Sequence, residues 1–501
     1  MEINSDSLRL ILGIKVHEFR KQAGYSLKQL AKKSGLSISY LSEIEKGKKY
    51  PKPGKIIQIA QALEKPFDEL ISLQLDENQN PLASLMNSPV FREFPLEQFG
   101  ITLNNVFELV NESPKKVGAL IRALLEIGRN YDLHVETFLL ASLRSYQKMH
   151  HNYFAELEAT AQEFESRHRS LLESEQRVDK LTTVLAKEFA CDIEFMDLAQ
   201  YPELSSLRSI WIFGDTDKVI VNKQLGEAQM TFILLREIGY RKLGLTERPI
   251  TSSWMNVDSF EQALNDFKAS YFAGAVTLPE ITIRDDLSTF LNNNSWEGEQ
   301  FWDIMDRYRV TPETFLHRLS QILPHHFGLQ NMHYLRLHNK VGSESYIVTK
   351  ELNTTDVFVP RGVGPNEHHC RRWISISLLQ QLGHAQQRGE HPNLLQSAQR
   401  SRFIQKDQTF FNFAMVRPLS LLEKTNAGMT LGFLIDDNFK QQVKFWNDSE
   451  VIEHKVNETC ERCPLSDDEC QDRVAPPKLL NIRRQQQSRE KALQEFIRNA
   501  R

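Results

Sequence analysis

The pattern that most constrains this chain is a pair of short amphipathic segments joined at Gly35. Ser26 is suited to cap the first of two helices, and Ser37 the second. Glycine enters the left-handed conformation at little cost, so the chain can turn sharply at Gly35 between them. At helical spacing, the apolar stripe of the first helix is Leu27, Leu30 and Ala31. The sequence therefore predicts two helices separated by a tight turn.

The second helix of this pair has a free face that suits the reading of bases in a DNA major groove. By their spacing, Leu41 and Ile44 face the core. The residues left on the free face are Ile38, Ser39, Tyr40, Ser42 and Glu43. Between residues 15 and 55, eleven Lys and Arg residues against three acids leave an excess of +8, in a chain of net charge -4. This excess suits phosphate contacts, and the alternative is an ordinary solvated helical hairpin.

Arg20 and the runs LKQLAKKSGLS and YLSEIEKGKKYP resemble the Cro/CI type of helix-turn-helix, also called the XRE family. The resemblance places a DNA-binding domain at residues 8–73 and implies an ion pair between Arg20 and Glu45. It also implies contacts to DNA phosphates near Leu27, Lys28, Lys46, Lys48 and Lys49. With Ser37 and the free face of the second helix, these residues make up the predicted DNA-binding set.

Length and composition set the frame for the rest of the chain. A chain of 501 residues should hold about three domains, and its 41% hydrophobic content is enough for packed cores. No apolar run approaches the roughly 20 residues that span a bilayer, and the start MEINSDSLRL lacks the features of a secretion signal. Five cysteines in such a length do not form a disulfide scaffold. We therefore expect a cytoplasmic protein with no membrane contact.

A long helical connector is expected after the DNA-binding domain. Residues 74–90 lack periodicity and are rich in Asn, Pro and Ser, which is typical of a linker. We assign residues 93–188 to a helical connector and dimerisation region. From Val135 to residue 189 there is no Gly or Pro, which predicts a long helix that joins domains or pairs with a partner chain. The alternative is a long helix packed on its own chain, and His150 and His151 are polar residues of this helix in either case.

Residues 189–284 predict an α+β domain. The strands are expected in CDIEFMDL, SIWIFG and KVIVN, and the helices in MTFILLREIGYRKLGL and SFEQALNDFKASYFAGAVTLP. The strand pair, the FILLREIGYRKLGL helix and the ASYFAGAVTLP segment resemble the ImmA/IrrE metallopeptidase-like domain. In active members, the first helix carries H-E-x-x-H, whose histidines bind zinc and whose glutamate activates water.

In this chain the corresponding five positions are Arg236, Glu237, Ile238, Gly239 and Tyr240. Both histidine ligands are replaced, and a guanidinium group stays protonated and cannot coordinate a cation. We expect Glu237 to act as a buried partner of Arg236 or Arg241. The domain is therefore predicted to keep its fold without proteolysis, and the protein is predicted not to be an enzyme.

Residues 285–480 predict a mixed α+β sensor domain with an antiparallel sheet. The expected strands are SYIVTKEL, DVFVP, WISISLL, FFNFAMVRPL and MTLGFLID, and the expected helices are EGEQFWDIMDRYRV and TPETFLHRLSQIL. RGVGPNEHHC lacks the Lys-Ser or Lys-Thr of a phosphate-binding loop, so we treat it as an ordinary loop. Residues 481–501 should form a basic, solvated helical tail. The predicted fold is multidomain: an all-α helix-turn-helix head, a long helical linker, an ImmA/IrrE-like α+β domain and this sensor domain.

Four cysteines in the sensor domain carry its strongest chemical signal. Three follow a C-x2-C-x6-C pattern and one lies upstream, in the order Cys370, Cys460, Cys463 and Cys470. Four soft thiolates suit a [4Fe-4S] cluster or a structural zinc, and the spacing does not choose between them. The remaining alternative is no metal. The histidines that could replace a ligand are His368, His369 and His454, and Cys191 is expected to be a buried core thiol.

The order of these domains resembles the short-chain fatty acyl-coenzyme A regulators. The runs QRVDKLTTVLA, SYFAGAVTLP and the closing C-x-x-R-x-A-P-P carry this resemblance. It implies a transcription factor that binds an acyl-CoA, controls carboxylate metabolism genes and holds an iron–sulfur cluster on four cysteines. Arginines that could meet phosphates, or could form surface ion pairs instead, are Arg361, Arg371, Arg372 and Arg417.

Three functions therefore stand at this point: a ligand-responsive transcriptional regulator, a DNA-binding redox or metal sensor, and a zinc metallopeptidase regulator. A homodimer is expected on DNA, because two heads on a two-fold axis read a palindrome whose half-sites lie about 34 Å apart. An effector must bind the DNA-competent and incompetent states with different affinity in order to switch the protein.

Overall fold

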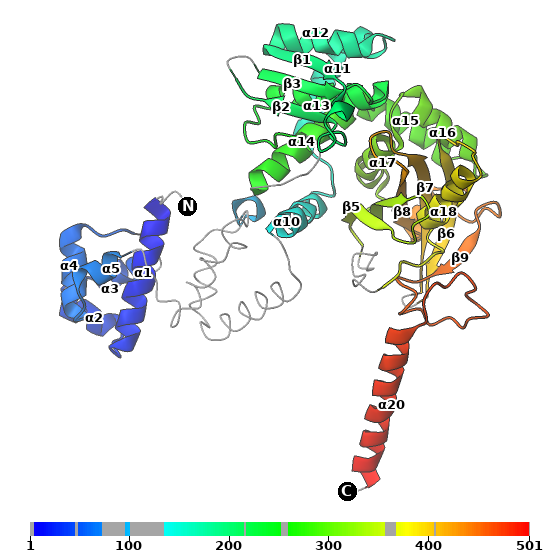
Figure 1. The fold of residues 1–501 in the computed structure, drawn as a ribbon. Helices are drawn as coiled ribbons and strands as arrows, with labels where there is room; N and C mark the ends of the chain where they lie inside the picture. The colour runs from blue at the N-terminus through cyan, green and yellow to red at the C-terminus, as the bar shows by residue number, and fades with distance from the viewer. Residues whose placement is uncertain are drawn as a thin grey trace. The chain divides into compact units, whose positions relative to one another are not determined.

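The computed structural model describes residues 5–45, 49–72, 96–100, 135–214, 217–251, 259–355, 367–404 and 407–499 (Figure 1). The chain divides into two compact units, Met1–Tyr146 with Val257–Phe260, and Gln147–Asn256 with Glu261–Arg501. Each unit is described by itself. Among the described helices, none is both long and apolar enough to cross a membrane.

The first unit contains a five-helix domain at its N-terminus. Its helices are α1 (Ser5–Gln22), α2 (Leu27–Ser34), α3 (Ile38–Glu45), α4 (Pro53–Ala62) and α5 (Phe67–Ile71). Their shared core includes Leu12, Val16, Leu30, Leu41, Ile44, Ile56, Ile59 and Leu70. A short 3-10 helix, η1 (Leu96–Phe99), follows later in the chain. The predicted linker at 74–90 and residues 101–134 of the predicted connector lie outside the described residues.

The prediction of one long helix after Val135 is wrong, because the chain turns twice. The three helices found are α10 (Val135–Met149), α11 (Ala155–Leu172) and α12 (Arg177–Phe189). His151 and Asn152 have φ values of 50° and 55°, and two left-handed residues end a right-handed helix. His150 and His151 accordingly lie at this turn and not within a helix.

Asn152 explains why the turn forms without a glycine or a proline. Its side chain accepts a hydrogen bond from Gln147 Nε2 (3.1 Å) and donates one to Ser320 Oγ (3.1 Å). Asparagine tolerates the left-handed region better than most residues, and here its buried amide is fully engaged. A contact with a residue far along the chain therefore fixes the turn.

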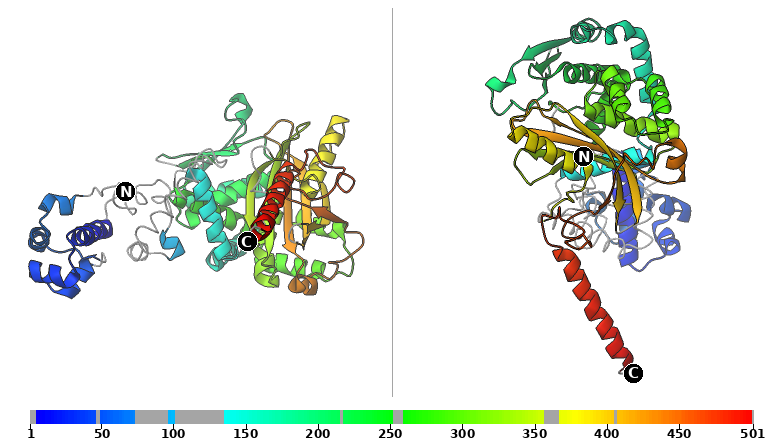
Figure 2. Two further views of the ribbon diagram at one scale, coloured as in Figure 1. Left: turned by 90° about the horizontal axis from the view of Figure 1, so that it is seen from below. Right: turned by 90° about the vertical axis from the view of Figure 1, so that its right-hand side faces the viewer.

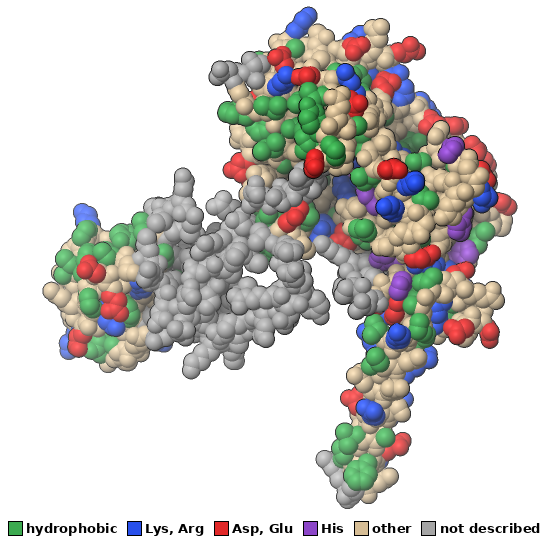
Figure 3. All heavy atoms as spheres, viewed as in Figure 1, with side chains coloured by type: hydrophobic (Ala, Val, Ile, Leu, Met, Phe, Trp, Pro, Cys, Tyr) green, Lys and Arg blue, Asp and Glu red, His purple; other side chains and the backbone are tan. Residues whose placement is uncertain are grey.

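The next part of the second unit is a small sheet with helices, as predicted. Its strands are β1 (Cys191–Met196), β2 (Ser209–Ile212) and β3 (Asp217–Asn222), in the order β1-β3-β2. β1 is parallel to β3, and β2 is antiparallel to it. A 3-10 turn, η2 (Leu198–Gln200), follows β1, and the helices are α13 (Glu227–Lys242) and α14 (Phe260–Thr277). Hydrophobic side chains gather at the surface over this part of the chain (Figure 3). Exposed apolar residues at or near β2 are Ile212, Phe213 and Ile250.

The C-terminal part of the second unit is built on a six-stranded sheet. Three helices precede the sheet, and they are α15 (Glu280–Leu291), α16 (Gly298–Arg307) and α17 (Pro312–Phe327). The strands are β4 (Met332–Lys340), β5 (Ile347–Asn353), β6 (Leu395–Phe403), β7 (Gln408–Pro418), β8 (Thr425–Leu434) and β9 (Glu453–Val456), in the order β5-β4-β8-β7-β6-β9. Neighbouring strands are antiparallel except β6 and β9. The remaining helices are α18 (Ile374–Gln387), α19 (Asp437–Gln442) and α20 (Lys478–Asn499).

Helices cover both faces of this sheet. On one face, Phe411, Phe413 and Met415 of β7 pack with α15, α16 and α17. On the other face, Ala414 and Val416 pack with α18. This alternation along β7 is the two-residue period of a strand buried on both sides.

The prediction of a strand at WISISLL is wrong, because these residues begin helix α18. Ile374, Leu378 and Leu382 recur every four residues and all lie in the core beneath the sheet. The β-branched start of the run suggested a strand, but burial of one helical face decided the structure. The predicted strand DVFVP and the first part of the loop RGVGPNEHHC lie outside the described residues.

The chain ends in α20, which starts three residues before the predicted tail. None of its described side chains is buried, as expected for a solvated helix. Figure 2 shows this helix, in red, extending alone from the sheet-bearing part of its unit. Backbone N–H groups of Leu479 and Leu480 donate to the carbonyl of Glu461 at 3.1 and 3.2 Å, which anchors only its first turn.

Candidate functional site

The two helices expected to bind DNA are fixed by caps at their N-termini and a glycine between them. Ser26 Oγ accepts a hydrogen bond from the Gln29 backbone N (3.2 Å), while Gln29 Oε1 accepts one from the Ser26 backbone N (2.7 Å). This reciprocal arrangement is a capping box. Gly35 has φ of 68°, and Ser37 Oγ accepts a hydrogen bond from Tyr40 N (3.1 Å) at the start of α3. The sequence pattern is therefore realised as a helix, a left-handed turn and a second helix.

An ion pair in the interior holds α1 against the end of α3. Arg20 Nε and Nη2 donate to the two carboxylate oxygens of Glu45 at 2.6 and 2.7 Å, and both side chains are buried. His17 Nδ1 lies 2.9 Å from Glu45 Oε2. Burial alone would raise the pKa of Glu45, but hydrogen bonds from Arg20 and His17 hold it below its ordinary value. A paired buried carboxylate keeps α3 in a fixed orientation relative to α1.

The free face of α3 is at least partly open to solvent at each of its five positions. Ile38 is 47% exposed, and Ser39 is also exposed, while Tyr40, Ser42 and Glu43 are half-buried. Lys49 Nζ lies 4.9 Å from the ring centre of Tyr40 and 3.5 Å from Glu43 Oε2. Lys28 is exposed near the start of α2, and Leu27 is half-buried. Lys46 and Lys48 lie outside the described residues.

The five positions of the altered peptidase motif lie in the buried middle of α13. Glu237 accepts hydrogen bonds from Arg248 Nη1 and Nη2 at 2.7 and 2.6 Å, and from Arg241 Nη1 at 3.0 Å. Arg236 Nη1 lies 3.4 Å from Asp266 Oδ1, which also accepts a hydrogen bond from Tyr240 Oη at 2.8 Å. The expected pairing of Glu237 with Arg241 is present, whereas Arg236 pairs with Asp266 and the main partner of Glu237 is Arg248.

Arg248 fills the space next to the motif. Its guanidinium carbon lies 3.9 Å from the ring centre of Tyr240 and 4.6 Å from that of Trp211. Burial would raise the pKa of Glu237, but the arginines around it hold that pKa below its ordinary value. On α14, Ala269 and Phe272 lie where a Cβ at Gly239 would meet them, at 3.0 to 3.3 Å.

These residues do not fit the zinc ion that the ImmA/IrrE resemblance implies. The two histidine positions hold an arginine and a tyrosine, and the glutamate that would activate water is bound by two arginines. A zinc ion would have to share this volume with permanent positive charges. No step of metal-dependent hydrolysis can be derived from this arrangement.

The four cysteines of the sensor domain are all buried and are brought to one region by the fold. Cys370 N donates to the carbonyl of Glu458 (3.3 Å), and Cys460 N donates to the carbonyl of His368 (3.0 Å). Cys463 N donates in turn to the carbonyl of Cys460 (3.2 Å), and Cys463 and Cys470 share a small apolar cluster with Leu465. Two segments separated by about ninety residues of sequence thus run side by side at Cys370 and Cys460.

Charged side chains hold these cysteine loops in place. Glu461 accepts from the His368 backbone N at 2.9 Å and lies 2.7 Å from His368 Nδ1. Trp373 Nε1 donates to the carbonyl of Asn457 (2.8 Å), and Arg372 Nε donates to Asp472 Oδ2 (2.8 Å). His368 is thus engaged with Glu461, and His454 is exposed on β9. Half-buried His369 forms an isolated bridge with Thr459.

The thiols suit a metal chemically, although they are not closed around a single ion. Burial raises the pKa of Cys370 to about 11 and also raises those of Cys460 and Cys463, so metal uptake would have to displace protons. Among the described residues, no three of the four sulfurs lie within 4.8 Å of one another. One tetrahedral zinc would bring them to about 3.8 Å. The fifth cysteine, Cys191, is fully buried and accepts a hydrogen bond from Arg241 Nη2 (3.0 Å).

A cluster of cations lies at one end of the sheet face that packs against α17. We call it the basic set, and its members are Arg208, Arg336, Lys350 and Arg417. Arg336 and Lys350 are direct partners across β4 and β5. Arg417 Nη2 and Nε donate to Glu313 Oε1 and Oε2 at 2.8 and 3.1 Å, and Arg336 Nη2 lies 4.0 Å from Glu313 Oε1.

The charges of the basic set are not balanced by the acid among them. Burial would raise the pKa of Glu313, but Arg417 and Arg336 lower it to about 2. Burial lowers the pKa of Lys350 to about 8 and that of His338 to about 4, and the positive charge of Arg336 adds to both effects. Arg336 Nε is buried without a hydrogen-bond partner in the described part of the chain. Glu313 is bonded to this set and Asp266 lies near Lys350, so the cations outnumber the acids here among the described residues.

Of the arginines predicted to meet phosphates, only Arg417 belongs to this set. Arg371 Nη2 bonds to Glu344 (3.0 Å) and Arg372 to Asp472, while Arg361 lies outside the described residues. Sequence reasoning missed Arg208, Arg336 and Lys350. Charges at Arg336 and His338, alternating with apolar residues along β4, were the available signal.

Comparisons with known proteins match two regions of the chain. Residues 16–70 match the helix-turn-helix family, and residues 186–320 match the IrrE N-terminal-like domain, beyond the boundary at 284 that the sequence suggested. The chain is 40% identical over 60 residues to the uncharacterized HTH-type transcriptional regulator YazB of Bacillus subtilis (strain 168), covering 12% of this chain and 87% of that protein.

A solved Mycobacterium tuberculosis transcriptional regulator is 16% identical, with a TM-score of 0.46 over 68% of this chain and 93% of the other. A likeness of this degree says nothing about ligand or operator. The helix-turn-helix head joined to an IrrE-like domain defines a DNA-binding transcriptional regulator. The chain belongs to the HTH-type transcriptional regulators.

Proposed function

We propose that this regulator binds palindromic operator DNA as a homodimer through α3, and that its C-terminal part responds to a short-chain acyl-CoA. The proposed base readers are Ile38, Ser39, Tyr40, Ser42 and Glu43. The proposed phosphate contacts are Leu27, Lys28, Lys46, Lys48 and Lys49, and Ser37 completes the proposed DNA-binding set. Their support is the exposed face of α3 and the excess of +8 around it.

The observation that carries the effector proposal is the uncompensated charge of the basic set. Arg336 and Arg417 lie within 4.0 Å of Glu313, and Arg208 and Lys350 lie beside Arg336. Such a set suits a ligand with several negative charges, and the phosphates of coenzyme A supply them. The apolar residues Met415 and Met429 lie on the same sheet face, in the core next to this set. The sequence resemblance to acyl-CoA regulators points to the same ligand class.

The test measures the affinity of the anaerobically purified protein for the DNA upstream of its own gene. The measurement is made at one salt concentration, with and without short acyl-CoAs. A tenfold change in DNA affinity, about 1.4 kcal/mol of coupling, is expected for the cognate acyl-CoA. Arg336→Gln should remove this change and leave DNA affinity without acyl-CoA intact. Arg388→Gln is the matched control, because Arg388 forms an exposed pair with Glu390. DNA binding that is tight but indifferent to every acyl-CoA would contradict the effector proposal.

We further propose that Cys370, Cys460, Cys463 and Cys470 hold an iron–sulfur cluster. Four buried thiols on two adjoining segments support this, and a cluster would supply a stable cross-link that also senses oxidants. The alternative function, a DNA-binding redox or metal sensor, rests on the same cysteines. Iron and sulfide analysis decides between the metals, because protein that holds structural zinc without iron or sulfide cannot sense redox state in this way.

We propose that the protein is not a peptidase. Support comes from Arg236 and Tyr240 at the ligand positions and from the two arginines bound to Glu237. Zinc-dependent peptide cleavage by purified protein would contradict this and restore the metallopeptidase regulator as a function.

A further inference from the structure

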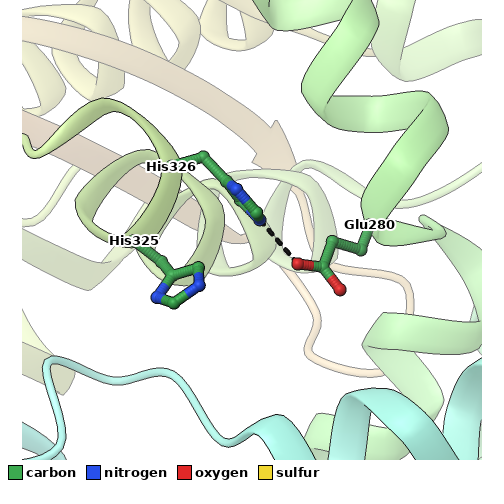
Figure 4. Close-up of side chains that lie close together, drawn as sticks. All are labelled: Glu280, His325 and His326. Carbon is green, nitrogen blue, oxygen red and sulfur yellow. Dashed lines mark hydrogen bonds and ion pairs between the residues drawn. The ribbon is translucent and has the colours of Figure 1, made fainter.

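Outside the sites above, two histidines and a glutamate from separate helices meet at the end of α17. His325 and His326 lie in its last turn, and Glu280 is the first residue of α15. One ligand atom from each of these three residues lies within 4.8 Å of the others, and they form the one such group of three or more His, Cys, Asp or Glu residues in the described ranges. Figure 4 shows the His326 ring directed at the Glu280 carboxylate, with His325 beside it on the same helix.

Tyr153 positions two of the three groups. Its hydroxyl donates to Glu280 Oε1 (2.8 Å), the same oxygen that lies 2.6 Å from His326 Nε2. Its ring stacks on that of His325, with centres 3.5 Å apart and planes 3° from parallel. In metal sites, the side chains that bind the ion are commonly oriented by neighbouring residues, as Tyr153 orients Glu280 and His325 here.

We propose that Glu280, His325 and His326 bind a divalent transition-metal ion of the zinc class, with water in the remaining positions. Imidazole nitrogen and carboxylate oxygen suit such an ion, whereas calcium and magnesium prefer oxygen alone. Ligand atoms of a tetrahedral zinc site stand about 3.3 Å apart. The three atoms therefore need to move by only about 1.5 Å or less to close around an ion.

The local charges also favour a cation at this place. The histidines lie at the C-terminal end of α17, which is the negative end of the helix dipole. His325 is exposed, so an ion can reach its imidazole from solvent. Glu280 adds a carboxylate at the same place.

A bound ion would tie together two segments that are distant in sequence, and Tyr153 from a third segment contacts both of them. Glu280 starts α15, the histidines end α17, and Tyr153 lies in the turn after α10. The metal would therefore also favour the packing of Tyr153 against His325 and Glu280. This proposal does not rest on DNA binding, on acyl-CoA or on the cysteines.

The experiment is a titration of the full-length protein with Co²⁺, followed by visible and near-ultraviolet absorption. We expect one equivalent of cobalt whose d–d bands appear without thiolate-to-cobalt charge transfer, since thiolate bands would report the cysteine loops instead. His326→Gln and Glu280→Gln should each weaken this cobalt binding at least tenfold. Tyr153→Phe should weaken it less, through loss of the hydrogen bond that orients Glu280.

His391→Gln is the matched control, because His391 is exposed and lies elsewhere on the chain. Should His326→Gln fail to fold by circular dichroism, exposed His325 offers a second variant, His325→Gln. Equal cobalt affinity in the wild-type protein and the folded ligand variants would overturn the proposal. Cobalt spectra that consist of thiolate bands alone would overturn it as well.

Discussion

At the scale of single residues, the altered peptidase motif forms a buried cluster of ion pairs where a peptidase would have its metal ligands. Glu237 lies between Arg241 and Arg248, and Arg236 is balanced by Asp266. In a peptidase the glutamate must reach a water on the metal, which requires a free carboxylate. Here the carboxylate is a structural anion, so its loss should be felt in stability.

Glu237→Gln should lower the free energy of unfolding by about 3–5 kcal/mol, because it leaves arginines buried without their partner. Urea unfolding measures this change. Glu163→Gln is the control, since Glu163 pairs with Lys242 at the surface and its replacement should leave stability unchanged. A Glu237→Gln protein of wild-type stability would show that the arginine cluster does not carry this energy.

Glu313 should make the free energy of unfolding depend on pH in the acid range. Its pKa of about 2 in the fold lies below the ordinary 4.5, so the unfolded chain binds the proton more readily. The stability due to this group is fully present above about pH 4.5 and is lost as the pH falls towards 2, by about 3 kcal/mol in total.

Glu313→Gln should therefore flatten the fall in the free energy of unfolding between about pH 5 and pH 3. Urea titrations at several pH values in that range measure the slope. Glu390→Gln serves for comparison, because the exposed pair with Arg388 is screened by solvent. Equal slopes for wild type and Glu313→Gln would refute the assignment.

Residues whose partners are set by local spacing could be predicted from the sequence, and others could not. The caps at Ser26 and Ser37 are local, because each lies within three residues of its partner. Arg248 and Asp266 reach the peptidase motif from a loop and from another helix, and no period in the sequence relates them to Glu237. The same holds for Arg208 and Lys350 of the basic set.

At the scale of elements, periodicity found most helices and strands and failed where tertiary contacts decided. The strands β1, β2, β3, β7 and β8 follow the predicted runs. The turn at Asn152 depends on Ser320, 168 residues away, so the local sequence could not reveal it. The start of helix α18 was predicted as a strand because it contains β-branched residues. Its apolar residues recur every four positions and face a core that forms only when the chain folds.

The close packing of the six-stranded sheet predicts different effects for two glycines. A Cβ at Gly432 of β8 would lie 2.1 Å from Asn412 Oδ1 and 2.3 Å from His333 Cε1. Gly432→Ala should therefore destabilise the protein by about 1–3 kcal/mol or more. At Gly383 of α18 nothing lies within 4 Å, so Gly383→Ala should be neutral or stabilise by up to about 1 kcal/mol. Thermal unfolding of both variants tests this, and equal effects would contradict it.

At the scale of the whole molecule, the proposed homodimer makes a prediction about stoichiometry. Two copies are expected per palindromic operator, since each head reads one half-site. Light scattering after size exclusion, with and without operator DNA, measures the mass. A monomer under both conditions would contradict the homodimer, while the helix-turn-helix head could still bind a single half-site.

The exposed helix α20 has a consequence for how the protein behaves during handling. Beyond the anchor at Leu479 and Leu480, only its own backbone hydrogen bonds hold it, and an isolated helix of this length opens readily. Its amide hydrogens should exchange with deuterium long before those of β7 and β8. Trypsin should cut first after Arg483, Arg484 and Arg489, so the chain would be trimmed from this end while the cysteine loops and the sheet stay whole.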